Sequence, residues 1–145
     1  MQEHPPGRSR NARTNAVLSV PVAEGFSGRR GYPVIWDEAN NGITLALFDH
    51  LPCCGVLLVD EAETGGRASI ATLGYAGTLM IRLATATERF APLKLAAMIP
   101  EPFMRFGAPV EGLHGPATYV AYALEAGTAG AMIEAALLPR FFHEV

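Results

Sequence analysis

After residue 31 the chain alternates between short apolar runs and clusters of turn-forming residues. Many of the runs contain β-branched and aromatic residues, which favour strands. The runs cover residues 32–36, 43–48, 55–59, 68–73, 78–83, 90–98, 118–124 and 131–138. Most of them end at Gly, Asn, Asp, Glu or Pro, residues that favour turns over regular structure. The pattern predicts a mainly β domain over residues 32–145, with a hairpin at the Asn40-Asn41-Gly42 break.

Two segments, residues 76–90 and 117–138, also contain good helix formers. The second is interrupted by Gly127 and Gly130, and each glycine inside a helix costs roughly 1 kcal/mol. A helix there would also be apolar on every face. We therefore expect strand, turn and strand over residues 117–138. Residues 78–98 are compatible with either a strand or a helix.

An internal repeat strengthens the β prediction. Residues 56–73 read VLLVDEAETGGRASIATL and residues 120–137 read VAYALEAGTAGAMIEAAL, with seven of eighteen positions identical at a spacing of 64 residues. The alignment pairs Gly66 with Gly130. Each unit predicts a strand, a turn with acidic and small residues, and a returning strand, and one such hairpin cannot bury its apolar face alone. We expect the units to pack into a small β-sandwich or barrel built from repeated hairpins.

The segments GVLLVDEAETGGRASIATLG, GTLMIRL and YVAYALEAGTAGAMIEAALLP resemble the head decoration proteins of tailed bacteriophages. That group repeats an apolar strand, an E-A-x-x-A-G-like turn and a second apolar strand. The resemblance covers roughly residues 55–138 and includes no catalytic signature. It implies a small β domain on the surface of an assembled capsid, often a trimer, with an extended arm that contacts neighbouring subunits.

Residues 1–31 differ in composition from the rest and predict an extended basic N-terminal arm. Only Glu3 and Glu24 oppose its arginines, Arg8, Arg10, Arg13, Arg29 and Arg30. Prolines, glycines, Ser and Asn prevent a compact element there. Residues 16–22 are apolar enough to pair as a strand if a sheet offers an edge.

Composition excludes several classes of protein. Half of the 145 residues are hydrophobic and 17% are charged, which is incompatible with a disordered chain. The net charge of −3 argues against a protein that binds nucleic acid by bulk electrostatics. No apolar run approaches eighteen residues, and the first residues lack the apolar core of a signal peptide. We expect no nucleic-acid or membrane partner, and a location on the virion or otherwise in the cytoplasm.

Candidate chemistry is sparse. Cys53 and Cys54 are adjacent and lack the spacing of a metal site, so we expect a buried strand start, with no metal or cofactor. The alternative is a small α+β enzyme that uses Asp49, His50 and Cys53 as acid, base and nucleophile. A second alternative is a small-ligand-binding barrel, which a large internal cavity would support.

Two aromatic segments are candidate interaction surfaces, because aromatic residues and Arg anchor protein interfaces. Phe103 and Phe106 lie between prolines, where we expect a loop, and Phe141 and Phe142 lie near the C-terminus. The sequence therefore predicts a non-enzymatic capsid decoration protein that forms a homo-oligomer, with a trimer favoured. Its basic arm would bind acidic shell protein and its phenylalanines would fill subunit contacts.

Overall fold

The computed structural model describes residues 17–47, 53–98, 101–108 and 117–144, of which 117–118 and 139–144 are described by their backbone only. These described segments form ten strands and one short 3-10 helix, η1 (Glu38–Asn40). The strands are β1 (Val17–Pro21), β2 (Pro33–Asp37), β3 (Gly42–Leu45), β4 (Gly55–Leu57), β5 (Arg67–Thr72), β6 (Leu79–Arg82), β7 (Pro92–Ala97), β8 (Met104–Gly107), β9 (Ala117–Ala123) and β10 (Met132–Glu144). No helix in the described segments is long and apolar enough to cross a membrane.

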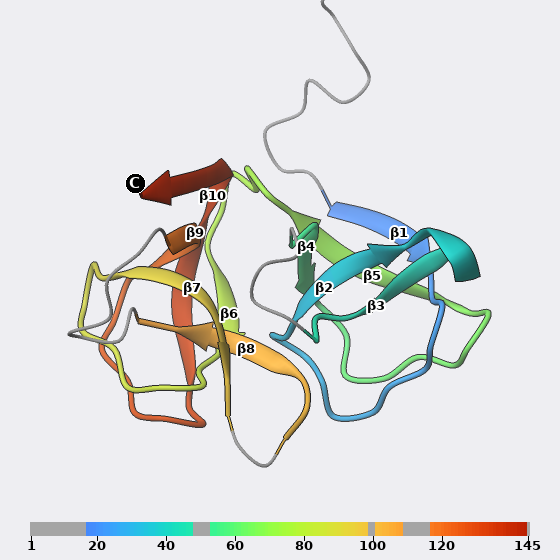
Figure 1. Cartoon of the computed structure of the whole chain (residues 1–145), viewed down its shortest axis with the longest axis horizontal. Helices are drawn as coiled ribbons and strands as arrows, with labels where there is room; N and C mark the ends of the chain where they lie inside the picture. Colours follow the sequence, from blue (N-terminus) through green and yellow to red (C-terminus); the bar gives the residue numbers. More distant parts are fainter. Residues whose placement is uncertain (1–16, 48–52, 99–100, 109–116, 145) are drawn as a thin grey trace, which may run out of the picture.

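The strands form two antiparallel five-stranded sheets that lie side by side (Figure 1). The first sheet has the order β1-β5-β4-β2-β3, and the second has the order β6-β10-β9-β7-β8. When β6 to β10 are matched to β1 to β5, the two orders are identical. Each sheet also curls until its two edge strands meet. A parallel bridge joins Val22, just after β1, to Ile43 of β3, and another joins Leu83, just after β6, to Phe106 of β8. The predicted fold class, a small mainly β fold built from repeated hairpins, is confirmed.

Hydrogen bonds around the hairpin turns show that the two halves repeat each other in detail. The amide of Gly65 donates to Val22 (2.9 Å) and the amide of Gly130 donates to Leu83 (3.0 Å). Both glycines have a positive φ, 81° and 86°, which glycine adopts at no steric cost. Gly130 is thus equivalent to Gly65, and the pairing with Gly66 at a spacing of 64 residues was wrong by one. The sequence alignment was chosen to match identical side chains, whereas the structural alignment follows from the hydrogen bonds and φ angles of the turn.

The open question over residues 78–98 is answered by two strands, β6 and β7. Residues 117–138 form strand, turn and strand, as expected. At the Asn40-Asn41-Gly42 break, η1 connects β2 to β3, and Asn41 ends it with a φ of 55°. Asp37 begins it, because its carboxylate accepts from the amide of Asn40 (3.3 Å). This is the usual role of an N-terminal capping side chain.

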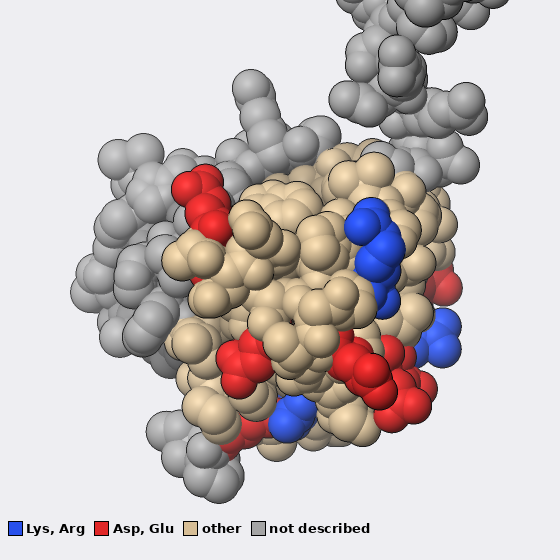
Figure 2. Space-filling model, turned by 90° about the vertical axis from the view of Figure 1, so that its right-hand side faces the viewer, with Lys and Arg blue, Asp and Glu red and all other residues tan. Residues whose placement is uncertain are grey.

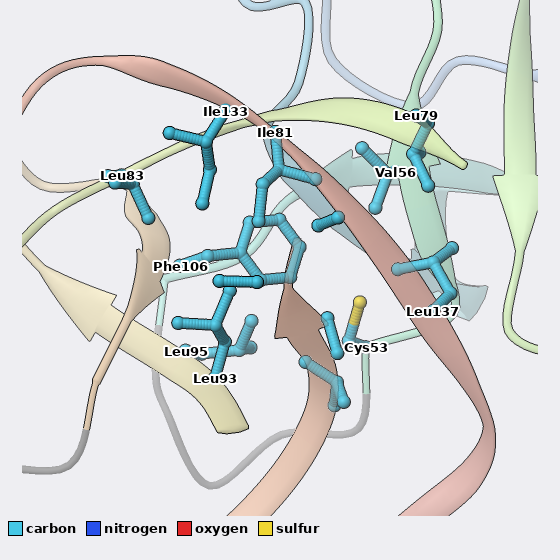
Figure 3. Close-up of a cluster of buried hydrophobic side chains, with 14 of the residues drawn as sticks. Cys53, Val56, Leu79, Ile81, Leu83, Leu93, Leu95, Phe106, Ile133 and Leu137 are labelled. Carbon is cyan, nitrogen blue, oxygen red and sulfur yellow. The ribbon is translucent and has the colours of Figure 1, made fainter. Parts of the chain in front are cut away.

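Two clusters of buried apolar side chains stabilise the fold. The first lies inside the first sheet and contains Val20, Val22, Tyr32, Val34, Ile43, Leu45, Leu57, Ala68 and Ile70. The second fills the second sheet and extends to residues of the first half, among them Cys53, Val56 and Ala71. In Figure 3, Val56 lies beside Leu79 of β6. The outer face of the first sheet therefore packs against the inner side chains of the second sheet, and both halves contribute to the second core.

The predicted boundary between an arm and a domain at residue 31 does not hold in the described part of the chain. β1 pairs with β5 from Val17–Ala71 to Pro21–Arg67. Val20 and Val22 are buried in the first cluster. An alternating apolar face made these residues a strand, because β5 offers the edge that the sequence could not show. Residues 1–16 lie outside the described segments.

Candidate functional site: partner-binding surfaces

Arg29, a predicted partner-binding residue, is engaged within the protein. Its guanidinium forms an ion pair with Glu101, which precedes β8. Glu101 also accepts from Arg105 Nε (3.0 Å) and from the hydroxyl of Tyr32 (3.1 Å). The Arg29 guanidinium lies 4.9 Å from the centre of the Phe103 ring. The cluster joins the segment before β2 to the segment around β8, so it fastens one half of the protein to the other.

Phe106 is not exposed on a loop, so the expectation was wrong for this residue, whereas Phe103 lies in the bend before β8. Met104–Gly107 form strand β8, which pairs with β7 from Ala97–Met104 to Lys94–Gly107. Phe106 is completely buried and lies at the centre of the second core (Figure 3). Phe103 is partly buried and packs against the first core. Prolines flank this segment without entering β8, so it was free to pair and turn Phe106 inward.

The remaining predicted contact residues are described only in part. Arg30 is exposed. Arg8, Arg10 and Arg13 lie outside the described residues. Phe141 and Phe142 belong to β10, where the backbone of Phe142 pairs with Tyr119, and their side chains are not described.

The first sheet, β1 to β5, presents an acidic face. Figure 2 shows acidic side chains gathered across the lower part of the face on the side of β1 to β5. Among the described residues of the first half, the exposed carboxylates are Glu24, Glu38, Asp60, Glu61 and Glu63, and the exposed cations are Arg30 and Arg67. At the tip of the β2–β3 hairpin, Pro21, Trp36, Asp37, Glu38, Asn41 and Gly42 line an open groove of about 390 Å³. The groove lies outside the curled sheet, whereas the interior is filled by the first core.

The Cys53 thiol is poorly suited to the alternative catalytic role. Its side chain is buried and donates a hydrogen bond to the carbonyl of Gly55 (3.2 Å). Burial raises its pKa to about 12, and burial also raises the pKa of Cys54 to about 12. The reactive form of cysteine is the thiolate, which is scarce near neutral pH at such a pKa. Asp49 and His50 lie outside the described residues. Among the residues that are described, no three His, Cys, Asp or Glu side chains are grouped to hold a metal.

The outer face of the second sheet carries apolar side chains that sequence reasoning missed. Tyr122 of β9 lies between Ala136 of β10 and Pro92 of β7 in one cross-strand row. Met80, on the neighbouring β6, is 41% exposed and Tyr122 is 39% exposed. Phe90, two residues before Pro92, is 63% exposed. We call these five residues the outer patch. The large Tyr122 between the small Ala121 and Ala123 was the sequence signal for it.

Phe90 has an unusual backbone conformation. Its φ is 67°, in the left-handed region, where bulky residues are rare. A side chain held there costs on the order of 1–2 kcal/mol. The ring lies under the guanidinium of Arg89, 4.6 Å from its centre. The positive φ of Phe90 therefore lowers the stability of the protein, although the ring remains largely exposed to water.

No family model and no curated protein matches this chain. Among solved structures, it is similar to the head fiber gp8.5 N base of bacteriophage phi29, with 8% sequence identity and a TM-score of 0.47. The match covers 89% of this chain and 98% of that chain. Similarity at this level identifies no residue of a site.

Proposed function

We propose that this chain is a non-enzymatic structural protein of a tailed-phage head, which decorates the assembled protein shell and stabilises it. The observation that carries the proposal is the repeated hairpin. The sequence segments that resemble head decoration proteins contain β4, β5, β6, β9 and β10, and among these strands β4 and β5 of the first half are equivalent to β9 and β10 of the second. The repeat is therefore present in the fold as well as in the amino-acid sequence.

The proposed mechanism uses two kinds of contact. Arg8, Arg10, Arg13 and Arg30 bind acidic surface on the major shell protein, and apolar surface joins copies of the chain, with a trimer expected. Arg29, Phe103 and Phe106 are left out because they serve the protein's own interior. On a symmetric lattice each copy needs only modest affinity for the shell, because linked copies bind with a high effective concentration.

Particles purified from cells that make this chain during phage growth provide the test. We expect the chain to co-purify with the heads, to dissociate under mild denaturant, and to rebind the stripped heads to a fixed number of copies per head. Replacing Arg8, Arg10 and Arg13 with alanine weakens rebinding and reduces its dependence on salt, because the arginines act through charge.

The His50→Ala variant is the matched control, and it rebinds like the unchanged protein if the site of the alternative enzyme is irrelevant. A chain that is absent from the heads, or that does not rebind to stripped heads at low salt, overturns the proposal.

A further inference from the structure

The duplicated halves allow each position of the first sheet to be compared with its equivalent in the second. Gly31 donates to Leu57 (3.0 Å), and Leu57 donates back to Tyr32 (3.0 Å). In the second half Phe90 donates to Ala123 (2.8 Å), and Ala123 donates to Ala91 (2.9 Å). Gly31 and Phe90 are thus equivalent, and both have a positive φ.

Strand pairing extends the comparison to the outer faces. Val56 pairs with Pro33 and with Ala71, and Tyr122 pairs with Pro92 and with Ala136. The row Pro33–Val56–Ala71 of the first sheet is therefore equivalent to the row Pro92–Tyr122–Ala136 of the second, which belongs to the outer patch.

The two rows differ in what covers them. Pro33, Val56 and Ala71 are buried, and Val56 and Ala71 belong to the core that is shared with the second half of the chain. At Gly31 a side chain would meet the backbone nitrogen of Arg82 and the sulfur of Met132, both at 3.1 Å. A side chain there would be tight against this cover, and the φ of 86° also favours glycine.

The equivalent face of the second sheet has no such cover among the described residues. Tyr122 is 39% exposed, and Phe90 stands where the covered sheet has glycine. In a stacked repeat protein the last unit carries a polar outer face, because no further unit covers it. Here the outer face of the last unit carries two charged residues, Lys94 and Glu134, but it also gains apolar bulk at Tyr122 and Phe90. Met80 takes the place of Ser19 beside β10, as the pairings Met80–Glu134 and Ser19–Ser69 show.

We propose that the outer patch, formed by Met80, Phe90, Pro92, Tyr122 and Ala136, is the surface to which a second copy of this chain docks. The inference rests on the proposed function, which expects copies to associate, and it names the surface that joins them. Inside the chain, the equivalent face is covered by a unit of the same fold. Phe90 places a ring at the position where Gly31 has no side chain, so the contact between copies differs in geometry from the contact within the chain.

Charges beside the outer patch favour a second copy as the occupant. On β7, Lys94 follows Pro92 on the same face of the strand, and on β10 Glu134 precedes Ala136 in the same way. The cation and the carboxylate thus lie on opposite sides of Tyr122 on β9. A uniformly acidic or basic partner would satisfy only one of the two charges. A second copy carries both, so the β7 side of one copy meets the β10 side of the next.

The test is the molar mass of the full chain by light scattering after size exclusion. We expect a closed oligomer that the Phe90→Gly and Tyr122→Lys variants dissociate, each raising the dissociation constant roughly ten- to thirtyfold. The Phe90→Gly monomer keeps or raises its melting temperature, because glycine suits a positive φ. Trp36→Ser, an exposed aromatic of the first sheet, is the matched control and stays oligomeric.

Charge reversal gives a second, independent measurement. Lys94→Glu weakens the oligomer, and adding Glu134→Lys restores it. The inference is overturned if the unchanged chain is a monomer at tens of micromolar, or if Phe90→Gly and Tyr122→Lys leave the oligomer intact. Head rebinding is measured separately: an oligomer that does not rebind heads refutes the proposed function alone, and a monomer that rebinds refutes this inference alone.

Discussion

Replacing Phe106 with alanine tests whether this residue belongs to the protein's own core or to an interface. Its ring is fully buried among side chains of the second core, including Ile81, Leu83 and Leu95 (Figure 3). Removing a buried phenylalanine side chain costs the free energy of burying its atoms and leaves a cavity, together about 3–5 kcal/mol. Small domains have about 5–15 kcal/mol of total stability, so the change removes a large share of it.

The assay is thermal and urea unfolding followed by circular dichroism. A loss of about 4 kcal/mol lowers the melting temperature of a chain of this size by roughly 10–15 °C. Phe106→Leu keeps most of the apolar volume and costs about 1 kcal/mol. Trp36→Ser, at a side chain 51% exposed, changes stability by about 0.5 kcal/mol or less.

An interface residue would behave differently. If Phe106 were exposed in the free protein, alanine there would leave the unfolding free energy nearly unchanged and would affect only association. A loss below about 1 kcal/mol for Phe106→Ala, with the unfolding still cooperative, refutes the assignment of Phe106 to the core.

Three further predictions concern other parts of the fold. Glu101→Gln removes the one carboxylate that Arg29 and Arg105 share and lowers the unfolding free energy by about 2 kcal/mol. This loss shrinks in 1 M salt, because screening weakens the ion pairs. Equal losses at low and high salt would contradict the prediction. Gly55→Ala places a Cβ 2.4 Å from the carbonyl oxygen of Ala71 and forces β4 away from β5. Urea unfolding therefore shows a loss of about 2–3 kcal/mol in the unfolding free energy. An unchanged midpoint of urea unfolding would show that the strands can move apart at no cost. The raised pKa of the Cys53 thiol contributes stability that is fully present below pH 9. This stability declines as the pH rises from 9 towards 12, by about 1 kcal/mol per pH unit. The decline is smaller in Cys53→Ala, and rapid alkylation of native Cys53 at pH 7 would contradict the raised pKa.

The fold was more predictable than the surfaces. Alternation of apolar and turn-forming residues located most of the strands, because burial on one face leaves a period of two in the sequence. The repeat predicted that the chain contains two related units. It could not predict that each unit is a complete five-stranded sheet, because only the β4–β5 and β9–β10 hairpins retain similar letters.

Side chains in connecting segments were the least predictable. Phe103 and Phe106 have the same residue type and similar neighbours in sequence, yet one stacks on Arg29 and the other fills the second core. The difference arises from pairing between β7 and β8, a contact that local composition does not encode. Phe90 was likewise indistinguishable from a core residue in the sequence. The structure shows that it is 63% exposed.

The unequal sharing of the two cores has a consequence for the order in which the chain acquires structure. The first core draws on residues up to Ile70, with only Phe103 added from the second half. The second core needs Cys53, Val56 and Ala71 from the first half. A chain leaving the ribosome can therefore complete its first sheet early, and that sheet then serves as the template on which the later strands assemble. The second sheet cannot complete its core before the first, because that core includes side chains from the first half of the chain.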